Sequence, residues 1–258
     1  MVNTKLIVEY DGTNYCGWQI QPEVSTVEGE LQNALVTVLK QRVVVASAAR
    51  TDRGVHAKGQ VVNFKIPFSL SPFQLTQALN SVLPPDIRVK KVQQMPEEFH
   101  SRYSANCKIY KYFIYNYRYL PPWLRKFRWW IKFSLDYQEM VSAASRLVGR
   151  HDFLSFQNKG SFSSSTIRCV EKIKIDKKGP LITVLIKADG FLYKMVRNIM
   201  GTLVEVGRGK FFPAEIADIL SAKDRKKAGP TAPPQGLFLW RVGYPRKFLE
   251  GSLTKIKG

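Results

Sequence analysis

The chain has 258 residues, 45% of them apolar, and its 40 Lys and Arg outnumber 20 Asp and Glu, so the formal net charge is +20. No segment approaches the roughly 18 consecutive apolar residues of a membrane helix, and acidic residues occur too early for a signal peptide. The three cysteines lack ligand-like spacing, which disfavours a metal or disulfide framework and favours a reducing compartment. We therefore expect a globular cytoplasmic protein without a metal site.

The positive charge is concentrated in the second part of the chain. Residues 1–105 hold 11 basic and 9 acidic side chains, whereas residues 106–258 hold 29 and 11. Such a charge attracts polyanions, and nucleic acid is the usual partner because Lys and Arg neutralise its phosphates. The alternative is a basic surface that only aids solubility.

Residues 1–105 are predicted to follow the order strand, helix, strand, strand, helix, strand. The apolar patterns predict strands over 5–10, 43–48, 61–66 and 87–95. Helical periodicity predicts helices over 26–40, with Thr26 as N-cap, and over 71–83, with Pro72 at the first position. This order is the ferredoxin-like, or split βαβ, pattern.

Residues 106–258 repeat the pattern loosely. Strands are predicted over 108–116, 165–176, 181–189 and 236–242, and helices over 136–149, 191–207 and from Pro213. The segment 149–156 is interpreted as a helix end followed by packed aromatic residues, and 158–165 and 223–235 as mobile loops. The prediction is an α+β protein of two tandem ferredoxin-like (βαββαβ) halves, residues 1–105 and 106–258.

The turn between the second and third predicted strands sets one carboxylate among cations. Asp52 lies between Arg50 and Arg53, and His56 and Lys58 follow. Asp before Arg-Gly is common turn chemistry, so a purely local role for Asp52 is the simpler interpretation. Nearby guanidinium groups also favour an ionised carboxylate, which on a loop could act as a nucleophile. This segment alone leaves both interpretations open.

A second candidate is the segment 110–133, in which eleven of 24 residues are aromatic and six are basic. Strand alternation puts Tyr110 and Tyr112 on one face. Bases stack on aromatic rings while Lys and Arg bind phosphates, so the mixture suits unstacked RNA. The alternative is that most of these rings build a core.

A third candidate is Arg197, which flanks the apolar stripe of the predicted helix 191–207 near Gly201. A solvated surface arginine is the default interpretation. An arginine beside an apolar stripe and a small residue more often has a buried anionic partner.

Taken in order, these segments resemble the TruA-type tRNA pseudouridine synthases over nearly the whole chain. The matching stretches are EYDGTNYCGWQIQP, TVEGELQNAL, RTDRGVHAKGQVVNF, FHSRYSANCKIYKYFIYN and, later, GRHDFLSF with FLYKMVRNIMGTLVEVGRGK. The resemblance implies that the two halves join into one mostly antiparallel sheet with helices on one side and the catalytic cleft between the halves. It also implies a homodimer that binds tRNA.

The resemblance assigns roles to individual residues. Asp52 matches the catalytic aspartate, Tyr110 the residue that packs against the target uracil, and Arg197 the arginine that pairs with the aspartate. Arg50 matches a basic residue that helps the target base out of its helix, and Leu237 falls where the family has an apolar pocket wall.

The implied reaction isomerises uridine to pseudouridine in the anticodon stem-loop, at tRNA positions 38 to 40. It involves no leaving group, redox change or energy donor, so no cofactor is expected. We further expect Arg53 and Lys58 to contact the RNA backbone. Nothing transfers from the family to the basic end, residues 246–258.

Two alternatives remain. Ferredoxin-like units with aromatic strands also serve as non-catalytic RNA-binding modules of the RRM kind, although KGQVVNF is a poor match to the RRM strand motif. An RNA hydrolase using Asp52 as acid or base would lack a histidine partner or a metal cluster.

Overall fold

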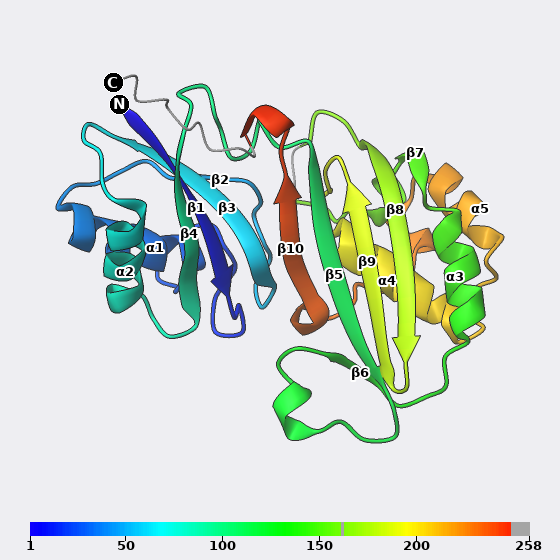
Figure 1. Cartoon of the computed structure of the whole chain (residues 1–258). Coiled ribbons are helices and arrows are strands. Elements are labelled where there is room, and N and C mark those ends of the chain that lie inside the picture. Colours follow the sequence, from blue (N-terminus) through cyan, green and yellow to red (C-terminus); the bar gives the residue numbers. More distant parts are fainter. Residues whose placement is uncertain (161–162, 249–258) are drawn as a thin grey trace. The chain divides into compact units, whose positions relative to one another are not determined.

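The computed structural model describes residues 1–160 and 163–248 (Figure 1). Residues 161–162 of the predicted loop and 249–258 of the basic end therefore lie outside the described part. The described residues divide into two compact units, one of residues 1–106 with 239–248 and the other within residues 107–238.

The first unit has the predicted order of elements. They are β1 (Val2–Tyr10), α1 (Val27–Leu39), β2 (Ala46–Ser47), β3 (His56–Ile66), α2 (Pro72–Val82) and β4 (Ile87–Met95). Its strands lie in the order β4-β1-β3-β2, and neighbouring strands are antiparallel. This is the strand order of the ferredoxin-like, or split βαβ, fold.

Local signals explain the first helix. The Thr26 hydroxyl accepts a hydrogen bond from the backbone N–H of Gly29 at 3.3 Å, and Lys40 ends α1 in the left-handed conformation with a φ of 57°. The apolar face of α1 carries Leu31 and Leu35, both fully buried. The helix thus starts at a polar cap and buries one stripe in the core.

Two predictions in the first unit are wrong. Of the predicted strand 43–48, only Ala46 and Ser47 pair with β3, and Val44 is 90% exposed. An apolar run becomes a strand only where a neighbouring strand offers hydrogen bonds, and that depends on distant residues. The third strand also begins earlier than predicted, at His56, so His56 and Lys58 belong to β3 and not to the turn.

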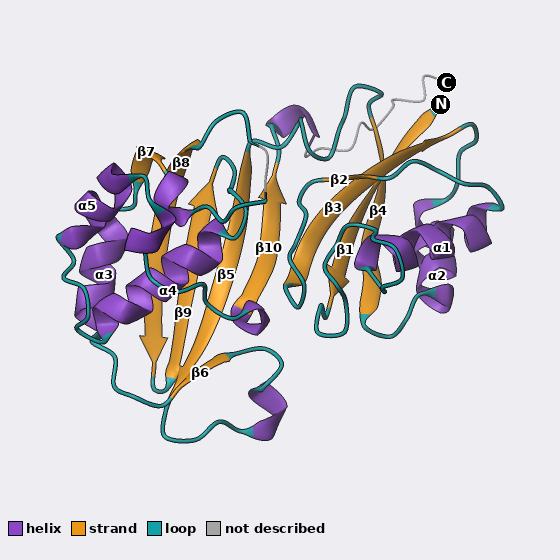
Figure 2. Cartoon of the chain, turned by 180° about the vertical axis from the view of Figure 1, so that it is seen from behind, coloured by secondary structure: helices purple, strands orange, loops and turns teal. Residues whose placement is uncertain are grey.

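The second unit has more elements than the repeat predicts (Figure 2). They are β5 (Cys107–Asn116), β6 (Trp129–Ile131), α3 (Tyr137–Ser145), β7 (Gly149–Asp152), β8 (Ile167–Lys178), β9 (Leu181–Ala188), α4 (Met195–Gly207) and α5 (Glu215–Ala222). Its strand order is β5-β9-β8-β7, with β6 pairing β5 in parallel. In Figure 2, α3 and α4 cover one face of this sheet.

Two boundaries in the second unit differ from the prediction. The segment 149–152 is not a helix end but the strand β7, which pairs with β8. Phe153 and Phe156, which follow it, are fully buried, as predicted. The helix α4 begins at Met195 and not at residue 191, because Lys194 adopts a φ of 58° that a right-handed helix cannot contain.

The C-terminal strand β10 (Leu237–Gly243) starts in the second unit, and the chain from Leu239 belongs to the first. Phe99 packs against the rings of Tyr244 and Phe248 at centroid distances of 5.1 and 5.3 Å. The Tyr244 hydroxyl donates to the carbonyl oxygen of Ser101 at 2.7 Å. The chain from Leu239 to Phe248 therefore packs in the first unit. The predicted division, in contrast, placed all residues after 105 in the second half.

The α+β class and the repeated, mostly antiparallel pattern are confirmed. No helix within residues 1–160 and 163–248 has the length and apolarity to span a membrane. A joined sheet with a cleft between the halves concerns the placement of the two units and stays a prediction.

The end of α4 suggests a pH-dependent contribution to stability. Burial of Glu205 raises the pKa of its carboxyl, but hydrogen bonds from Lys210 and Arg208 outweigh burial and leave the pKa below 4.5. Both cations lie 2.9 Å from the carboxylate. A carboxyl whose pKa is lower in the folded than in the unfolded chain stabilises the folded state at any pH above its unfolded-state pKa. This contribution is lost as the pH falls through the folded-state pKa.

We therefore expect Glu205→Gln to lower the free energy of unfolding at pH 7 by about 1 kcal/mol. The difference from the unsubstituted chain should shrink as the pH falls below 4.5, the ordinary value for this carboxyl. Urea unfolding of both proteins, from pH 7 to below pH 4.5, measures this difference in the free energy of unfolding. Glu98→Gln, on an exposed side chain, is the control, and equal losses in both variants would contradict the prediction.

Candidate active site

Asp52 lies on the loop between β2 and β3. The backbone N–H of Val55 donates to the carbonyl oxygen of Asp52 at 3.1 Å and closes a tight turn. Gly54 has a φ of 75° at the third position of this turn, where glycine is favoured. Asp52 is half-buried, and Arg50 and Arg53 are exposed. The loop thus carries one carboxylate between two exposed guanidinium groups.

Buried side chains fix the backbone that leads to Asp52. The Gln60 amide, fully buried on β3, donates to the carbonyl oxygen of Ala49 at 2.6 Å and accepts from its N–H at 3.3 Å. The hydroxyls of Tyr10 and Thr51 lie 2.8 Å apart. Buried polar groups with satisfied partners specify one geometry, so the approach to Asp52 is rigidly set.

The segment that follows β1 packs against the same loop. The N–H of Trp18 donates to the carbonyl oxygen of Thr51 at 3.0 Å, and the N–H of Gly54 donates to that of Tyr15 at 3.3 Å. Gly17 has a φ of 95°, and a Cβ atom there would lie 2.8 Å from the Thr51 carbonyl oxygen. Only glycine satisfies both the conformation and the close approach.

The two β3 residues contact other parts of the first unit. His56 is fully buried; its Nδ1 accepts from the N–H of Gly12 at 3.0 Å and lies 3.1 Å from Oδ1 of Asp11. The Nζ of Lys58 lies 3.4 Å from Oε2 of Glu9. His56 therefore joins the segment after β1 to β3, and Lys58 has an acidic neighbour. An RNA contact of Lys58 stays a prediction.

In the second unit, Tyr110 and Tyr112 share one face of β5. The ring of Tyr110 is 7% exposed and meets Phe191 edge-on at a centroid distance of 5.1 Å. The Tyr112 hydroxyl donates to the carbonyl oxygen of Pro233 at 2.7 Å. Burial raises the pKa of Tyr112 well above its ordinary value, and the charge of Arg197 partly counters the rise. Arg197 therefore lies close to Tyr112.

Arg197 is half-buried on α4 and bound to a distant segment. Its Nε donates to the carbonyl oxygen of Ala232 at 2.7 Å, and its own carbonyl oxygen accepts from the N–H of Ala232 at 3.0 Å. Leu237, at the start of β10, is 5% exposed. The interpretation of Arg197 as a solvated surface residue is therefore wrong, and Leu237 is apolar and buried, as a pocket wall requires.

The aromatic and basic segment divides into a buried strand and an exposed arm, residues 117–133. Most rings on β5 are buried, with Tyr112 fully so. The strongly exposed rings follow β5, and they are Tyr117, Tyr119, Trp123, Trp130 and Phe133. The Nε1 of Trp130 donates to the carbonyl oxygen of Tyr117 at 2.8 Å, so the start of the arm is hydrogen-bonded to a residue near its end. Within the segment 110–133, the rings exposed enough to stack on bases therefore belong to the arm. Strand alternation could not predict this, because the arm follows the strand β5.

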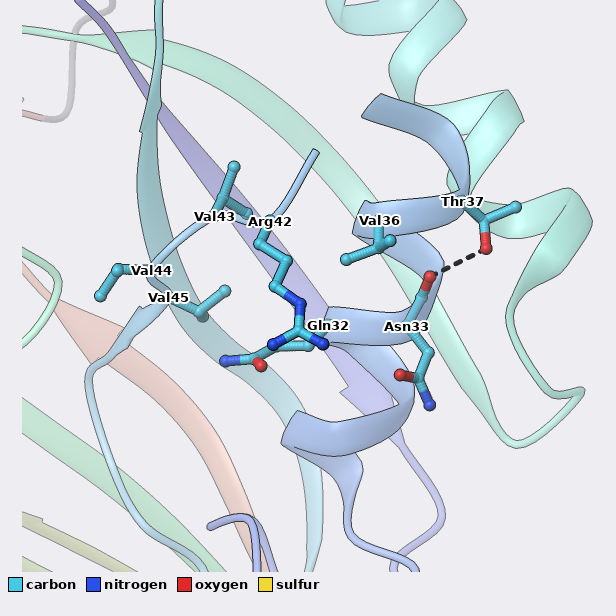
Figure 3. Close-up of a pocket in the computed structure, with 8 residues that line it drawn as sticks. All are labelled: Gln32, Asn33, Val36, Thr37, Arg42, Val43, Val44 and Val45. Carbon is cyan, nitrogen blue, oxygen red and sulfur yellow. Dashed lines mark hydrogen bonds between the residues drawn. The ribbon is translucent and has the colours of Figure 1, made fainter. Parts of the chain in front are cut away.

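A surface groove lies beside the C-terminal half of α1 (Figure 3). Its lining residues are Gln32, Asn33, Val36, Thr37, Arg42, Val43, Val44 and Val45. Within the helix, the Thr37 hydroxyl donates to the carbonyl oxygen of Asn33 at 2.9 Å. The lining offers no carboxylate and none of the predicted site residues, so this groove is not the candidate active site.

Within residues 1–160 and 163–248, no group of three or more His, Cys, Asp or Glu side chains is placed to hold a metal ion. The three cysteines are partly exposed and form no disulfide. The expectation of a cofactor-free site therefore continues to rest on the chemistry of the reaction.

Comparison with known proteins decides the family. The sequence profile of the family described as tRNA pseudouridine synthase matches residues 6–104 and 143–245. The chain belongs to the tRNA pseudouridine synthase family. It is therefore an isomerase that acts on tRNA uridine. Arg50, Asp52 and Arg197 lie inside the matched ranges, and Tyr110 lies between them.

Curated relatives match along nearly their whole length. The tRNA pseudouridine synthase A of Thermoanaerobacter sp. (strain X514) is 49% identical over 244 residues, which cover 95% of this chain and 100% of the relative. The enzyme of that name from Geobacillus kaustophilus is 43% identical over 251 residues, 97% of each chain. That from Pseudothermotoga lettingae is 41% identical over 239 residues, 92% of this chain and 98% of the relative.

Among solved structures, a chain of a Cbf5-Nop10-Gar1 complex aligns with a TM-score of 0.35 at 11% identity. The alignment covers 78% of this chain and 54% of that chain. The similarity is too low to inform the site.

The predicted site residues fall into two groups. Arg50, Asp52 and Arg53 share one loop of the first unit. Tyr110 and Arg197 belong to the second unit, where Arg197 lies close to Tyr112 on the strand that also carries Tyr110. Their meeting in one site stays a prediction.

Sequence reasoning missed the residues that support these groups. Gln60 carried a usable signal, since a polar side chain inside the apolar run of β3 needs a buried partner. Gly17 carried none, because its role depends on a contact with a segment more than 30 residues away.

Proposed function

We propose that Asp52 is the nucleophile of a cofactor-free conversion of uridine to pseudouridine in the tRNA anticodon stem-loop. In this proposal Tyr110 packs against the target uracil and Arg197 pairs with Asp52. The observation that carries it is the loop of Asp52, where one half-buried carboxylate stands on a backbone fixed by Gln60 and Gly17. Membership of the family supports pseudouridine formation as the reaction, and the loop carries Asp52, a carboxylate that can act as its nucleophile.

The reaction requires little beyond a positioned nucleophile. The N1–C1′ bond breaks, the uracil turns, and C5 joins C1′; C5 loses a proton and N1 gains one. No electrons are exchanged with another molecule. A carboxylate that adds to C6 of the base or to C1′ of the ribose and later leaves is sufficient. Its rigid support keeps the reacting oxygen within bonding distance of the target.

The target base must first leave its stack, which requires a few kcal/mol. Arg50 and Arg53 are exposed on the same loop as Asp52, where guanidinium groups can bind phosphates as the base turns out. The exposed rings of the arm, residues 117–133, can stack on unpaired bases. The family resemblance further supports a cytoplasmic homodimer with tRNA lying across both subunits.

One assay separates this function from its alternatives. The full-length chain is incubated with tRNA tritiated at C5 of its uridines, without any added cofactor. Release of tritium with intact RNA strands is the expected result, because C5 loses its hydrogen when it joins C1′. Strand scission would indicate a hydrolase, and binding with neither event would indicate a non-catalytic RNA-binding module.

A further inference from the structure

A second arginine, Arg225, lies in the segment between α5 and β10, in a short 3-10 turn (Arg225–Lys227). It is half-buried, and burial lowers the pKa of its guanidinium. Its hydrogen bonds reach the side-chain oxygens of Asn158, Asn198 and Thr231 at 3.2, 3.0 and 3.1 Å, and the carbonyl oxygen of Ala228 at 3.3 Å. These four acceptors are all neutral, so Arg225 binds oxygens of the chain itself.

Asn198 is the centre of this network. It is fully buried on α4, directly after Arg197. Its amide nitrogen donates to the carbonyl oxygen of Phe156 at 2.7 Å and to Oδ1 of Asn158 at 2.8 Å. Its amide oxygen accepts from the Thr231 hydroxyl at 2.6 Å and from Arg225. A buried network satisfied in this way specifies one arrangement of the segments it joins.

The segment that the network holds is residues 228–233, which we call the strap. The strap lies along α4: the N–H of Gly229 donates to the Thr202 hydroxyl at 2.9 Å. A Cβ atom on Gly201 would lie 1.6 Å from the carbonyl oxygen of Pro230, so the strap touches the helix backbone. Further along, Ala232 exchanges two hydrogen bonds with Arg197.

We propose that Arg225 is a positioning residue for Arg197. Arg225 holds the strap at Ala228 and Thr231, and the strap places the Ala232 carbonyl oxygen that orients the Arg197 guanidinium. This inference rests on the proposed function, in which Arg197 pairs with Asp52.

The chemistry of arginine suits this task. The planar guanidinium fork reaches several acceptors at fixed angles, whereas a lysine ammonium has a single nitrogen that cannot span the same oxygens. Without the fork, the strap would lose the hydrogen bonds from Arg225 to Ala228 and Thr231 and the link to Asn158. The Thr231 hydroxyl would still donate to Asn198, so we expect the strap to shift while the helix α4 stays in place. A displacement of about 1 Å at a positioning group can lower the rate about 100-fold without a matching loss of binding.

The test uses the full chain and the C5-tritium assay over a range of tRNA concentrations. We expect Arg225→Gln to lower kcat by about 30-fold or more while KM changes less than about threefold. Arg225→Lys should give an intermediate kcat, because charge without the fork restores only part of the network. Lys226→Gln, exposed on the same turn, is the matched control, and its kcat should stay within about twofold of the unsubstituted chain.

Thr231→Val provides a milder variant, since it keeps side-chain shape and removes one hydroxyl of the network. Its kcat should also fall. If circular dichroism shows that Arg225→Gln is unfolded, the kcat of Thr231→Val tests the inference in its place. An unchanged kcat in folded Arg225→Gln, or a loss confined to KM, would overturn the inference while leaving the proposed function intact. Absence of tritium release from the unsubstituted chain would instead overturn the proposed function, and this inference with it.

Discussion

Replacing Asp52 by Asn is expected to abolish pseudouridine formation while tRNA binding survives. An amide has nearly the shape of a carboxylate but is not a nucleophile, so the loss should reach at least about 1,000-fold in rate. The loop itself should persist, because its turn is closed by the backbone carbonyl oxygen of Asp52, which the substitution keeps. Single-turnover tritium release measures the reaction, and filter binding with the same tRNA measures affinity.

The matched control for this substitution is Asp218→Asn. Asp218 is exposed on α5, and the change removes the same charge without approaching the loop. Its turnover should match that of the unsubstituted chain. Near-normal turnover in Asp52→Asn would refute the nucleophile assignment, and equal losses in both variants would trace the effect to net charge.

Substituting Gly17 by Ala is expected to lower activity about 100-fold although residue 17 performs no chemistry. The new Cβ atom would lie 2.8 Å from the Thr51 carbonyl oxygen and 3.2 Å from the Arg53 nitrogen. Both are backbone atoms of the loop that carries Asp52, so relief of the clash moves the carboxylate. We also expect a loss of stability of about 1–3 kcal/mol from strain and contact together. Tritium release and thermal unfolding measure the two effects.

Gly179→Ala separates strain from contact. Gly179 has a φ of 56°, and nothing lies within 4 Å of the position its Cβ would take. This variant should lose about 1 kcal/mol of stability from backbone strain alone, with kcat unchanged. Should Gly17→Ala behave like Gly179→Ala, the close approach of residue 17 would not support the Asp52 loop.

Regular elements with a clear period were predictable. The alternation over 87–95 coincides with β4, and the cap and stripe of α1 placed that helix within one residue at each end. Strand predictions were wrong where pairing with a neighbouring strand determines whether a segment becomes a strand. Residues 43–45 read as a strand but have no partner, and Gly149–Asp152 forms one because β8 lies beside it.

The candidate site divides in the same way. Short motifs were enough to identify the family and to predict roles for Asp52 and Arg197, because each motif lies within a few neighbouring residues. Only the tertiary structure decided that Gln60 and Gly17 hold the Asp52 loop and that Arg225 reaches the strap beside Arg197. Gly17 approaches Thr51, and Arg225 reaches Asn158 and Asn198, which are 67 and 27 residues away along the chain. The hydrophobic period that marks a helix or strand can be read from consecutive residues. A contact between distant residues, in contrast, exists only once the packing of the whole unit has brought them together.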